Sequence, residues 1–273
     1  MIKTIGIIAK RHKKASKIAK RLVKISLNRG LTPVLEESTA EMINRQDLGV
    51  PLEDIDADVI FTVGGDGTIL LVERHLKKEI PICGINIGGV GFLTEISPEN
   101  TEFALDNIIE GRYGIEERSK ISLSIGGEPL PDALNEVVIM TFMPGKMLNL
   151  EVWVNGQLAE SFGTDGIILA TPTGSTAYAM SAGGPIIDPR VDAFVIVPIC
   201  PFKLSARPLV VPSDSLVKVK ITKPEMRSIV VVDGQYERKV KIETEFLIKK
   251  SKRKAHFIKF SEDFYEKVRE KIG

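Results

Sequence analysis

The stretch that decides the fold is Val63-Gly64-Gly65-Asp66-Gly67-Thr68, in which one carboxylate stands among three glycines. It follows Asp58 to Thr62 in a run that is rich in β-branched and aromatic side chains and does not alternate with polar ones, which predicts a buried parallel strand ending at Val63. The apolar residues from Ile69 to Leu76 predict a helix after it. The glycines therefore lie at the carboxyl end of a parallel strand, where open α/β sheets bind their ligands.

The glycines of this turn predict a phosphate-binding site. Because glycine lacks Cβ, its backbone can adopt positive φ and let a phosphate approach the amide groups of a helix N-terminus. We expect Gly64, Gly65, Gly67 and Thr68 to form this site. Asp66 would repel a phosphate, so we expect it to hold a metal, to bind a hydroxyl or to take the proton of that hydroxyl. A purely structural alternative is that Asp66 or Thr68 caps the helix.

Composition and charge exclude several classes of protein. The chain has 273 residues, of which 43% are hydrophobic and 27% charged, as in a soluble globular protein of one large or two smaller domains. The net charge of +1 gives no overall field that would attract nucleic acid or an anionic membrane, and we expect neither as a partner. Met1 to Ile5 leads directly into a strand and no apolar run reaches membrane-spanning length, so we expect a cytoplasmic protein.

The few cysteines and histidines give no metal-binding pattern. Cys83 and Cys200 both lie among apolar residues, which predicts two reduced, buried thiols rather than a disulfide. With three histidines and two cysteines, the spacing of metal ligands is absent from the sequence.

Strands alternate with helices in the first part of the chain, which predicts a parallel sheet. The predicted strands besides the one at Val63 are Thr4 to Ala9, Thr32 to Leu35 and Ile80 to Asn86, and the predicted helices include Ala15 to Ser26 and Thr101 to Gly111. The loop from Lys10 to Lys14, after the first strand, contains no glycine. A dinucleotide-binding fold of the ordinary dehydrogenase type would carry its glycine-rich fingerprint there, so that class is excluded.

The second part of the chain has the pattern of antiparallel strands. Ile121 to Ile125 alternates with period two, and Leu150 to Val154 is followed by Asn155-Gly156, a strong hairpin signal. Further short strands are predicted at Val217 to Ile221, Ile229 to Val232, Lys239 to Glu243 and Phe246 to Lys250. The pattern predicts a β-sandwich.

These observations predict an α/β plus β protein. We expect a Rossmann-like parallel-sheet domain over residues 1-112, an antiparallel β-sandwich over 113-255, and a C-terminal helix over 256-273 that packs back on the first domain.

Two motifs in the second part indicate a polar, phosphorylated ligand. The first motif runs from Gly163 to Ala170 and continues from Thr171 to Ser181. It predicts a hydroxyl-rich turn followed by a helix of small residues, whose N-terminal amide groups can bind a ligand. The alternative is a capped helix with a turn at Asp165. Asn135 and Glu136 precede the strand that begins at Val137, where they can bind base edges or ribose hydroxyls or simply end the strand.

Together these motifs resemble those of NAD kinases. The matching segments are Gly64 to Thr68, Asn86 to Leu93, Asn135-Glu136, Thr164 to Gly166 and Thr171 to Tyr178, in the order of the family and extending to Asp233-Gly234-Gln235. The first motif also resembles diacylglycerol and sphingosine kinases, whereas the eight residues from Thr171 to Tyr178 are specific.

The resemblance implies Mg²⁺-dependent transfer of a phosphoryl group to the 2′-hydroxyl of the adenosine ribose of NAD, giving NADP, with ATP or inorganic polyphosphate as donor. It implies that Asp66 accepts the proton and that the dinucleotide contacts Asp66, Gly67, Asn135, Glu136, Lys146, Gly163, Asp165, Thr176, Ala177, Tyr178, Ala179, Met180, Ser181 and Gln235. No fixed metal site is implied, because the donor's phosphates and water can hold Mg²⁺. It further implies a homodimer or homotetramer whose sites borrow residues from a neighbouring subunit.

Two other functions compete with this interpretation. A lipid kinase sharing the glycine motif would need an apolar or basic membrane-facing surface, which the neutral charge disfavours. A dinucleotide-binding sensor without catalysis would not need Asp66 among its companion motifs.

The densest basic run, Lys249 to Lys254, follows a strand predicted to end at Ile248. It predicts either a solvated hairpin turn or a path for a long polyphosphate donor.

Overall fold

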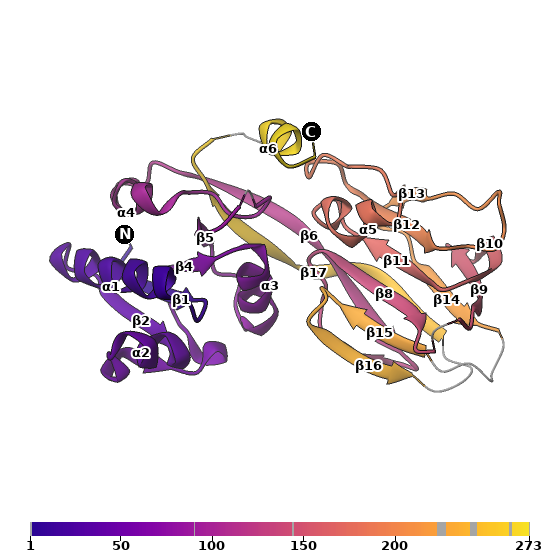
Figure 1. Ribbon diagram of the computed structural model, residues 1–273, viewed down its shortest axis with the longest axis horizontal. Helices are drawn as coiled ribbons and strands as arrows, with labels where there is room; N and C mark the ends of the chain where they lie inside the picture. The colour runs from indigo at the N-terminus through magenta and orange to yellow at the C-terminus, as the bar shows by residue number, and fades with distance from the viewer. Residues whose placement is uncertain are drawn as a thin grey trace. The chain divides into compact units, whose positions relative to one another are not determined.

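The computed structural model describes residues 2–89, 91–143, 145–222, 228–240, 245–261 and 264–272. The chain divides into two compact units, which Figure 1 shows in the colours of the sequence. Unit 1 comprises Met1–Glu117 and Ala255–Gly273, and unit 2 comprises Arg118–Lys254. Each is described by itself. The division into segments 1-112, 113-255 and 256-273 that the sequence predicts stays a prediction.

Unit 1 is built on a parallel sheet with the strand order β17-β5-β4-β1-β2-β3. Its strands are β1 (Thr4–Ala9), β2 (Thr32–Glu36), β3 (Gly49–Val50), β4 (Val59–Gly64), β5 (Ile82–Asn86) and the last part of β17 (Glu245–Lys259). Gly64, at the end of β4, pairs with Asn86, at the end of β5. The glycine motif and the loop after β5 are therefore neighbours at the carboxyl edge of the sheet. The glycines lie at the carboxyl end of a parallel strand, as the sequence predicts.

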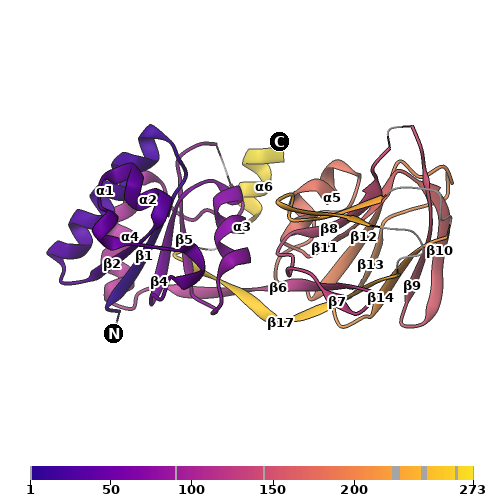
Figure 2. The same cartoon turned by 90° about the horizontal axis from the view of Figure 1, so that it is seen from below.

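Helices cover both faces of this sheet. α1 (Lys13–Asn28), α2 (Glu37–Ile43) and α4 (Thr101–Ile109) share one core with alternate strand residues, including Phe61 and Val63 (Figure 2). α3 (Asp66–His75) packs on the other face, where an added Cβ on Gly84 would lie 2.7 Å from Ile69 Cδ1. Short 3₁₀ helices at Gln46–Leu48, Leu52–Asp54 and Pro98–Asn100 complete this part of the unit.

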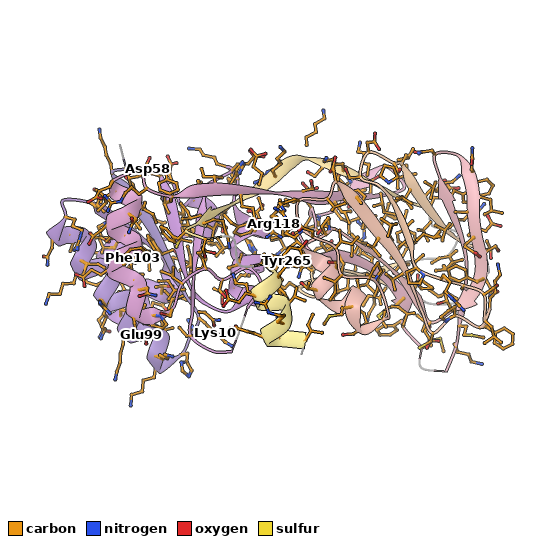
Figure 3. All side chains as sticks on the ribbon, turned by 90° about the horizontal axis from the view of Figure 1, so that it is seen from above. Lys10, Asp58, Glu99, Phe103, Arg118 and Tyr265 are labelled. Atoms are coloured by element: carbon orange, nitrogen blue, oxygen red, sulfur yellow. The ribbon has the colours of Figure 1, made fainter. Side chains whose placement is uncertain are left out.

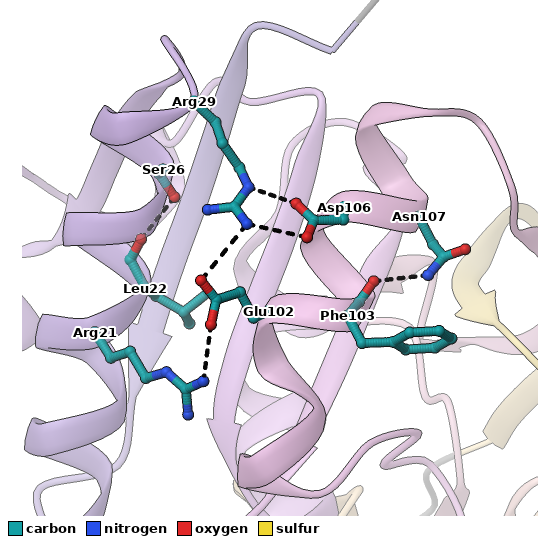
Figure 4. A network of polar contacts seen from close by, with 8 residues as sticks. All are labelled: Arg21, Leu22, Ser26, Arg29, Glu102, Phe103, Asp106 and Asn107. Atoms are coloured by element: carbon teal, nitrogen blue, oxygen red, sulfur yellow. Dashed lines mark hydrogen bonds and ion pairs between the residues drawn. The ribbon is translucent and has the colours of Figure 1, made fainter.

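An ion-pair network joins α1 to α4 (Figure 4). Arg29 donates to both carboxylate oxygens of Asp106, through Nε and, at 3.0 Å, through Nη2. Glu102 lies 3.5 Å from Arg29 and 3.1 Å from Arg21. The buried Ser26 hydroxyl donates to the Leu22 carbonyl at 2.7 Å within α1. The bidentate pair fixes the spacing of the two helices above their shared apolar core.

The C-terminal helix α6 (Phe264–Ile272) belongs to unit 1. Lys267 Nζ donates to the carbonyl of Thr94 at 2.8 Å, and the Phe264 ring lies 6.3 Å from the ring of Phe92. Tyr265, labelled in Figure 3, is largely exposed on this helix. The prediction that this helix packs back on the first domain is confirmed.

Unit 2 is a sandwich of two antiparallel sheets. One sheet has the order β13-β12-β11-β8-β15-β16, and the other, in this unit, has the order β10-β9-β14-β17 with β6 beside β17 and β7 beside β6. The strands are β6 (Gly114–Ile125), β7 (Glu128–Pro129), β8 (Glu136–Thr141), β9 (Leu148–Val154), β10 (Gln157–Thr164), β11 (Gly166–Ala170), β12 (Ala193–Ile199), β13 (Leu209–Pro212), β14 (Val217–Ile221), β15 (Ser228–Val232) and β16 (Tyr236–Val240).

The sandwich core forms from alternate residues of both sheets. Val137, Ile139 and Leu169 of one sheet pack with Leu150 and Val219 of the other, all of them buried. The predicted β-sandwich is confirmed, and so is the hairpin at Asn155-Gly156, where both residues have positive φ. The outer face of the six-stranded sheet packs against Ala179 of the short helix α5 (Tyr178–Ser181).

Several details of the sequence prediction are wrong. The basic run is not a hairpin turn, because β17 continues through it to Lys259. Lys250 also pairs with Asp192, with Nζ 2.6 and 2.8 Å from its two carboxylate oxygens. Cys200 is exposed rather than buried, whereas Cys83 is buried as expected. Residues 241–243 of the strand predicted from Lys239 to Glu243 lie outside the described residues.

Candidate active site

Asp66 is the first residue of α3, at the carboxyl end of β4. The N-cap position is occupied by Gly65, which has no side chain to accept a capping bond, so neither Asp66 nor Thr68 caps the helix. Gly65 is in an extended conformation, with φ −120° and ψ −170°. None of Gly64, Gly65 and Gly67 has positive φ, contrary to the expectation for a phosphate cradle.

The carboxylate of Asp66 binds the loop that follows β5. Its Oδ2 accepts from the backbone N–H of Phe92 at 2.9 Å, and its Oδ1 accepts from Leu93 at 3.1 Å and Thr94 at 3.3 Å. The side chain nevertheless stays 25% exposed. Three donors thus fix the orientation of a carboxylate that a ligand can still reach.

Glycines shape the space around this carboxylate. An added Cβ on Gly91 would lie 2.5 Å from Asp66 Oδ1 and 2.5 Å from Thr94 Oγ1, so only glycine fits there. Added Cβ atoms on Gly65 and Gly67 would meet nothing within 4 Å, which leaves room for a ligand. At Gly64 the corresponding space is filled by Thr68, whose Oγ1 would lie 2.1 Å away. Gly65 and Gly67 are therefore open to a phosphate, and Gly64 is not.

The start of the loop after β5 is held in a similar way. The Asn86 side chain donates to the carbonyl of Gly89 at 2.6 Å and accepts from the N–H of Gly88 at 3.0 Å. Ile87 N–H donates to the carbonyl of Gly64 at 3.1 Å. The described part of this loop is therefore fixed to the end of β4 beside Asp66.

In unit 2, Asp233 holds the backbone that leads into β8. Its carboxylate accepts from the N–H groups of Leu134 at 2.8 Å, Asn135 at 2.7 Å and Glu136 at 3.1 Å. Burial raises the pKa of Asp233, and these three bonds oppose the rise. Sequence reasoning missed this residue as part of a site, although its position in an Asp-Gly turn between two strands was a signal for a fixed backbone.

Glu136 is a buried acid with one oxygen available. Its residue is 5% exposed, and its Oε2 has no hydrogen-bond partner among the described residues. Burial, and secondly the charge of Asp233, raise the pKa of Glu136 to about 8, while a hydrogen bond from the Tyr178 backbone opposes the rise. At neutral pH this carboxyl group is therefore mainly protonated and can donate a hydrogen bond.

The hydroxyl-rich segment packs directly on these residues. Thr171 donates its N–H to the carbonyl of Asn135 at 2.9 Å and its hydroxyl to the carbonyl of Leu134 at 2.6 Å. An added Cβ on Gly174 would lie 2.1 Å from the Asn135 carbonyl oxygen, so the contact requires glycine. Arg118, labelled in Figure 3, is buried and donates to Thr173 Oγ1 at 3.1 Å. The helix expected here is shorter than predicted, a turn of 3₁₀ helix at Gly174–Thr176 followed by α5.

The predicted dinucleotide residues of unit 2 form two groups. The first lies near the start of β8 and comprises Asn135, Glu136, the segment from Thr176 to Ser181, and Gln235, whose N–H donates to the carbonyl of Val232 at 3.0 Å. Within that segment Thr176 and Ala179 are buried, Ala177 and Met180 are half-buried, and Tyr178 and Ser181 are exposed.

The second group comprises Asp165, Gly163 and Lys146, and of these Asp165 lies at the opposite end of the six-stranded sheet from Glu136. Asp165 directly precedes β11, and its carbonyl accepts from the N–H of Thr141 at the end of β8. Gly163 is near the end of β10, and Lys146 is exposed in the connection to β9. Ala170, which pairs with Glu136, is four residues from Gly166, roughly 14 Å along an antiparallel strand. One chain therefore does not bring Asp165 next to Glu136.

Unit 1 contains a cavity beside α1 and α2. It has a volume of about 660 Å³ and is lined by Arg11, His12, Lys13, Ser16, Lys17, Lys20, Ser38, Glu41 and Met42. None of the predicted site residues lines it.

The described residues contain no group of three His, Cys, Asp or Glu side chains placed to hold a metal ion, and no helix among them is long and apolar enough to cross a membrane.

Unit 1 thus carries a glycine-flanked aspartate at the edge of a parallel sheet, and unit 2 carries a hydroxyl-rich turn on a β-sandwich. The model of the ATP-NAD kinase N-terminal domain matches residues 5–113, and that of the ATP-NAD kinase C-terminal domain matches residues 134–260. The chain belongs to the NAD kinase family.

Curated relatives agree over almost the full chain. The NAD kinase of Methanothermobacter thermautotrophicus is 51% identical over 271 residues, which cover 98% of this chain and 95% of the relative. The NAD kinase of Thermococcus kodakarensis is 46% identical and covers 98% of both chains.

Solved structures show the same fold. An NAD kinase from Archaeoglobus fulgidus in complex with ATP is 34% identical, with a TM-score of 0.81 over 98% of this chain and 99% of that one. Yeast NADH kinase complexed with NADH is 24% identical, with a TM-score of 0.92 over 100% of this chain and 88% of that one, and shows the likeness of fold alone.

Proposed function

We propose that this enzyme transfers the γ-phosphoryl group of ATP to the 2′-hydroxyl of the adenosine ribose of NAD, giving NADP, and that Asp66 accepts the hydroxyl proton. The observation that carries the proposal is the Asp66 carboxylate, oriented by three backbone donors and still 25% exposed. The Archaeoglobus relative was solved with ATP, which supports ATP as the donor. The curated relatives are named NAD kinase, which supports NAD as the acceptor.

The chemistry suits a carboxylate of this kind. A ribose hydroxyl has a pKa far above 7, so a carboxylate does not deprotonate it in the ground state. It orients the hydroxyl and receives the proton as the new P–O bond forms. The fixed orientation of Asp66 reduces the cost of reaching that geometry.

We assign dinucleotide recognition in unit 2 to the residues at the start of β8. Glu136 Oε2 is buried and has no hydrogen-bond partner among the described residues, so a ligand can supply one. The backbone of Asn135 and Glu136 is fixed by Asp233, and Thr176 stands in the segment that packs on them. A polar ligand with hydroxyl and amide groups, such as NAD, fits this set.

Asp165 lies at the opposite end of β11 from Ala170, which pairs with Glu136, so we assign Asp165 to the site of a neighbouring subunit in a homodimer or homotetramer. We assign Gly163 of β10 and Lys146 of the connection to β9 to the same neighbouring site.

The donor brings its own metal in this proposal. Asp66 is already bound by three N–H groups and no cluster of three candidate ligands occurs among the described residues, so Mg²⁺ would be held by the donor's phosphates and by water. Bound there, Mg²⁺ neutralises charge on the phosphates. Gly65 and Gly67 leave room for these phosphates beside Asp66. Inorganic polyphosphate stays a second candidate donor.

The test is an assay of the purified protein with NAD, MgCl₂ and ATP, in which an NADP-specific dehydrogenase detects the product. We expect NADP to form, and parallel reactions with NADH and with polyphosphate define the substrate range. A lipid kinase would instead phosphorylate diacylglycerol in mixed micelles. A sensor would bind NAD in calorimetry without turnover, and either result would overturn the proposal.

A further inference from the structure

The C-terminal helix brings a lysine to the candidate proton acceptor. Lys271 Nζ lies 4.0 Å from Asp66 Oδ2 and 4.3 Å from the centre of the Phe92 ring. The N–H of Phe92 donates to the same carboxylate oxygen. The Lys271 side chain is 36% exposed, so its ammonium group can still contact a ligand.

The position of Lys271 is set by contacts nearer the start of α6. Phe264 packs on the ring of Phe92, and Lys267 donates to the carbonyl of Thr94. Phe92 and Thr94 also donate two of the three bonds that orient Asp66. One short segment, residues 92–94, therefore positions both the carboxylate and the helix that carries the lysine.

We propose that Lys271 is a catalytic residue that contacts the transferred phosphoryl group beside Asp66. The proposal rests on the proposed function. A donor that reaches Asp66 brings negative phosphate oxygens close to a negative carboxylate, and this repulsion opposes the reaction. An ammonium group at this distance from the carboxylate offsets the repulsion, and it stabilises the charge that spreads over the phosphoryl oxygens in the transition state.

A contribution to stability alone does not explain why Lys271 lies beside Asp66. This lysine is near the end of the last helix, its partner lies at 4.0 Å, and partly exposed ion pairs of this kind add little to stability. Replacing it therefore leaves the fold intact and isolates its effect on the reaction.

The test compares three variants in the NADP-forming assay. Lys271→Gln removes the charge, Lys271→Arg keeps it, and Arg269→Gln removes an exposed cation from the same helix as a matched control. We expect Lys271→Gln to lower kcat about 10- to 100-fold and to weaken ATP binding, while the KM for NAD changes less than about twofold. Lys271→Arg should recover most of the loss, and Arg269→Gln should behave as the wild type.

Each other result overturns the proposal. If Lys271→Gln keeps kcat and ATP affinity within about twofold of the wild type, Lys271 does not contact the donor. If Lys271→Gln and Lys271→Arg lose activity equally and both melt at lower temperature, the residue is structural. If the wild type forms no NADP, the proposed function itself fails. If the wild type is active, Asp66→Asn is inactive and Lys271→Gln is unaffected, the proposed function stands and only the role of Lys271 is refuted.

Discussion

The hydrogen bonds of Asp66 fix its orientation. Three N–H groups of residues 92–94 donate to its two carboxylate oxygens. The ribose hydroxyl becomes acidic only as its bond to phosphorus forms, so the proton moves late in the reaction. We therefore expect orientation to be the larger contribution of this carboxylate.

Replacing Asp66 by Asn should lower kcat by about 10² to 10⁴, the range for losing a positioned general base. The amide has one acceptor oxygen where the carboxylate has two, so part of the loop after β5 loses its anchor and stability should fall by about 1 to 3 kcal/mol. Steady-state kinetics well below the melting temperature, with NAD affinity from calorimetry, separate the two effects. An unchanged kcat would remove Asp66 from the mechanism.

Replacing Gly91 by Ala should disturb the reaction without touching a reacting group. The new Cβ would lie 2.5 Å from Asp66 Oδ1, so the carboxylate must shift, and a displacement of about 1 Å can reduce kcat about 100-fold. Gly89→Ala is the matched control, because its Cβ meets nothing within 4 Å. Equal kinetics for both variants would show that the loop absorbs the methyl group and that the orientation of Asp66 matters little.

Glu136 should make stability depend on pH. Its pKa is raised to about 8 in the folded chain, above its usual value, so it stabilises the fold fully below pH of about 4.5 and the contribution is lost as pH rises to about 8. Glu136→Gln has no such titration. We expect melting temperatures across this range to fall more in the wild type than in the variant, with Asp233, whose pKa is also raised, accounting for what remains. Parallel curves would contradict the raised pKa of Glu136.

At the scale of elements, the docking of the hydroxyl-rich segment on the start of β8 is the contact that forms the first group of dinucleotide residues. It depends on Thr171, which binds two carbonyl groups there, and on the missing side chain of Gly174. The segment is short and little of it is helical, so packing rather than helix propensity determines its shape.

Replacing Gly174 by Ala should separate these two elements. The Cβ would lie 2.1 Å from the Asn135 carbonyl oxygen, and overpacking of this kind costs about 1 to 3 kcal/mol or more. We expect a melting temperature lower by several degrees and a higher KM for NAD, because Asn135 and Glu136 move together. Gly114→Ala, where the nearest atom is 3.7 Å away, controls for the added methyl group. If neither variant raises the KM for NAD, NAD is not recognised by Asn135 and Glu136.

At the scale of the whole molecule, Asp66 and Asp165 should serve one site from two subunits. Asp165 directly precedes β11, whereas Glu136 pairs with Ala170 at the other end of that strand. This separation within one chain is the reason to expect a site shared by two subunits. Asp66→Asn and Asp165→Ala, each impaired alone, should regain activity when they are unfolded, mixed and refolded together, since one of the two sites in a mixed dimer is then complete.

The measurement is NADP formation at NAD concentrations below the wild-type KM, because losing Asp165 should affect recognition more than kcat. A mixture that is no more active than the sum of its parts would mean that both aspartates act within one chain, or that no shared site forms.

The sequence by itself determined the fold class, a parallel sheet with helices followed by an antiparallel β-sandwich. The buried run before Gly64, the helical spacing in α1 and the Asn155-Gly156 hairpin are local signals, and the chain folds as they predict. The motifs also brought Asp66, Asn135, Glu136 and the Thr171 segment forward as candidates.

Only the tertiary structure decided what surrounds them. Asp66 is bound by amides of residues 92–94, Lys271 reaches it from the last helix, and the raised pKa of Glu136 comes from burial and from Asp233. β17 continues through the basic run because β14 pairs with its first part and β5 with its last part. Hydrogen bonds and burial between residues far apart in the chain leave no local pattern, because they exist only after the elements have packed.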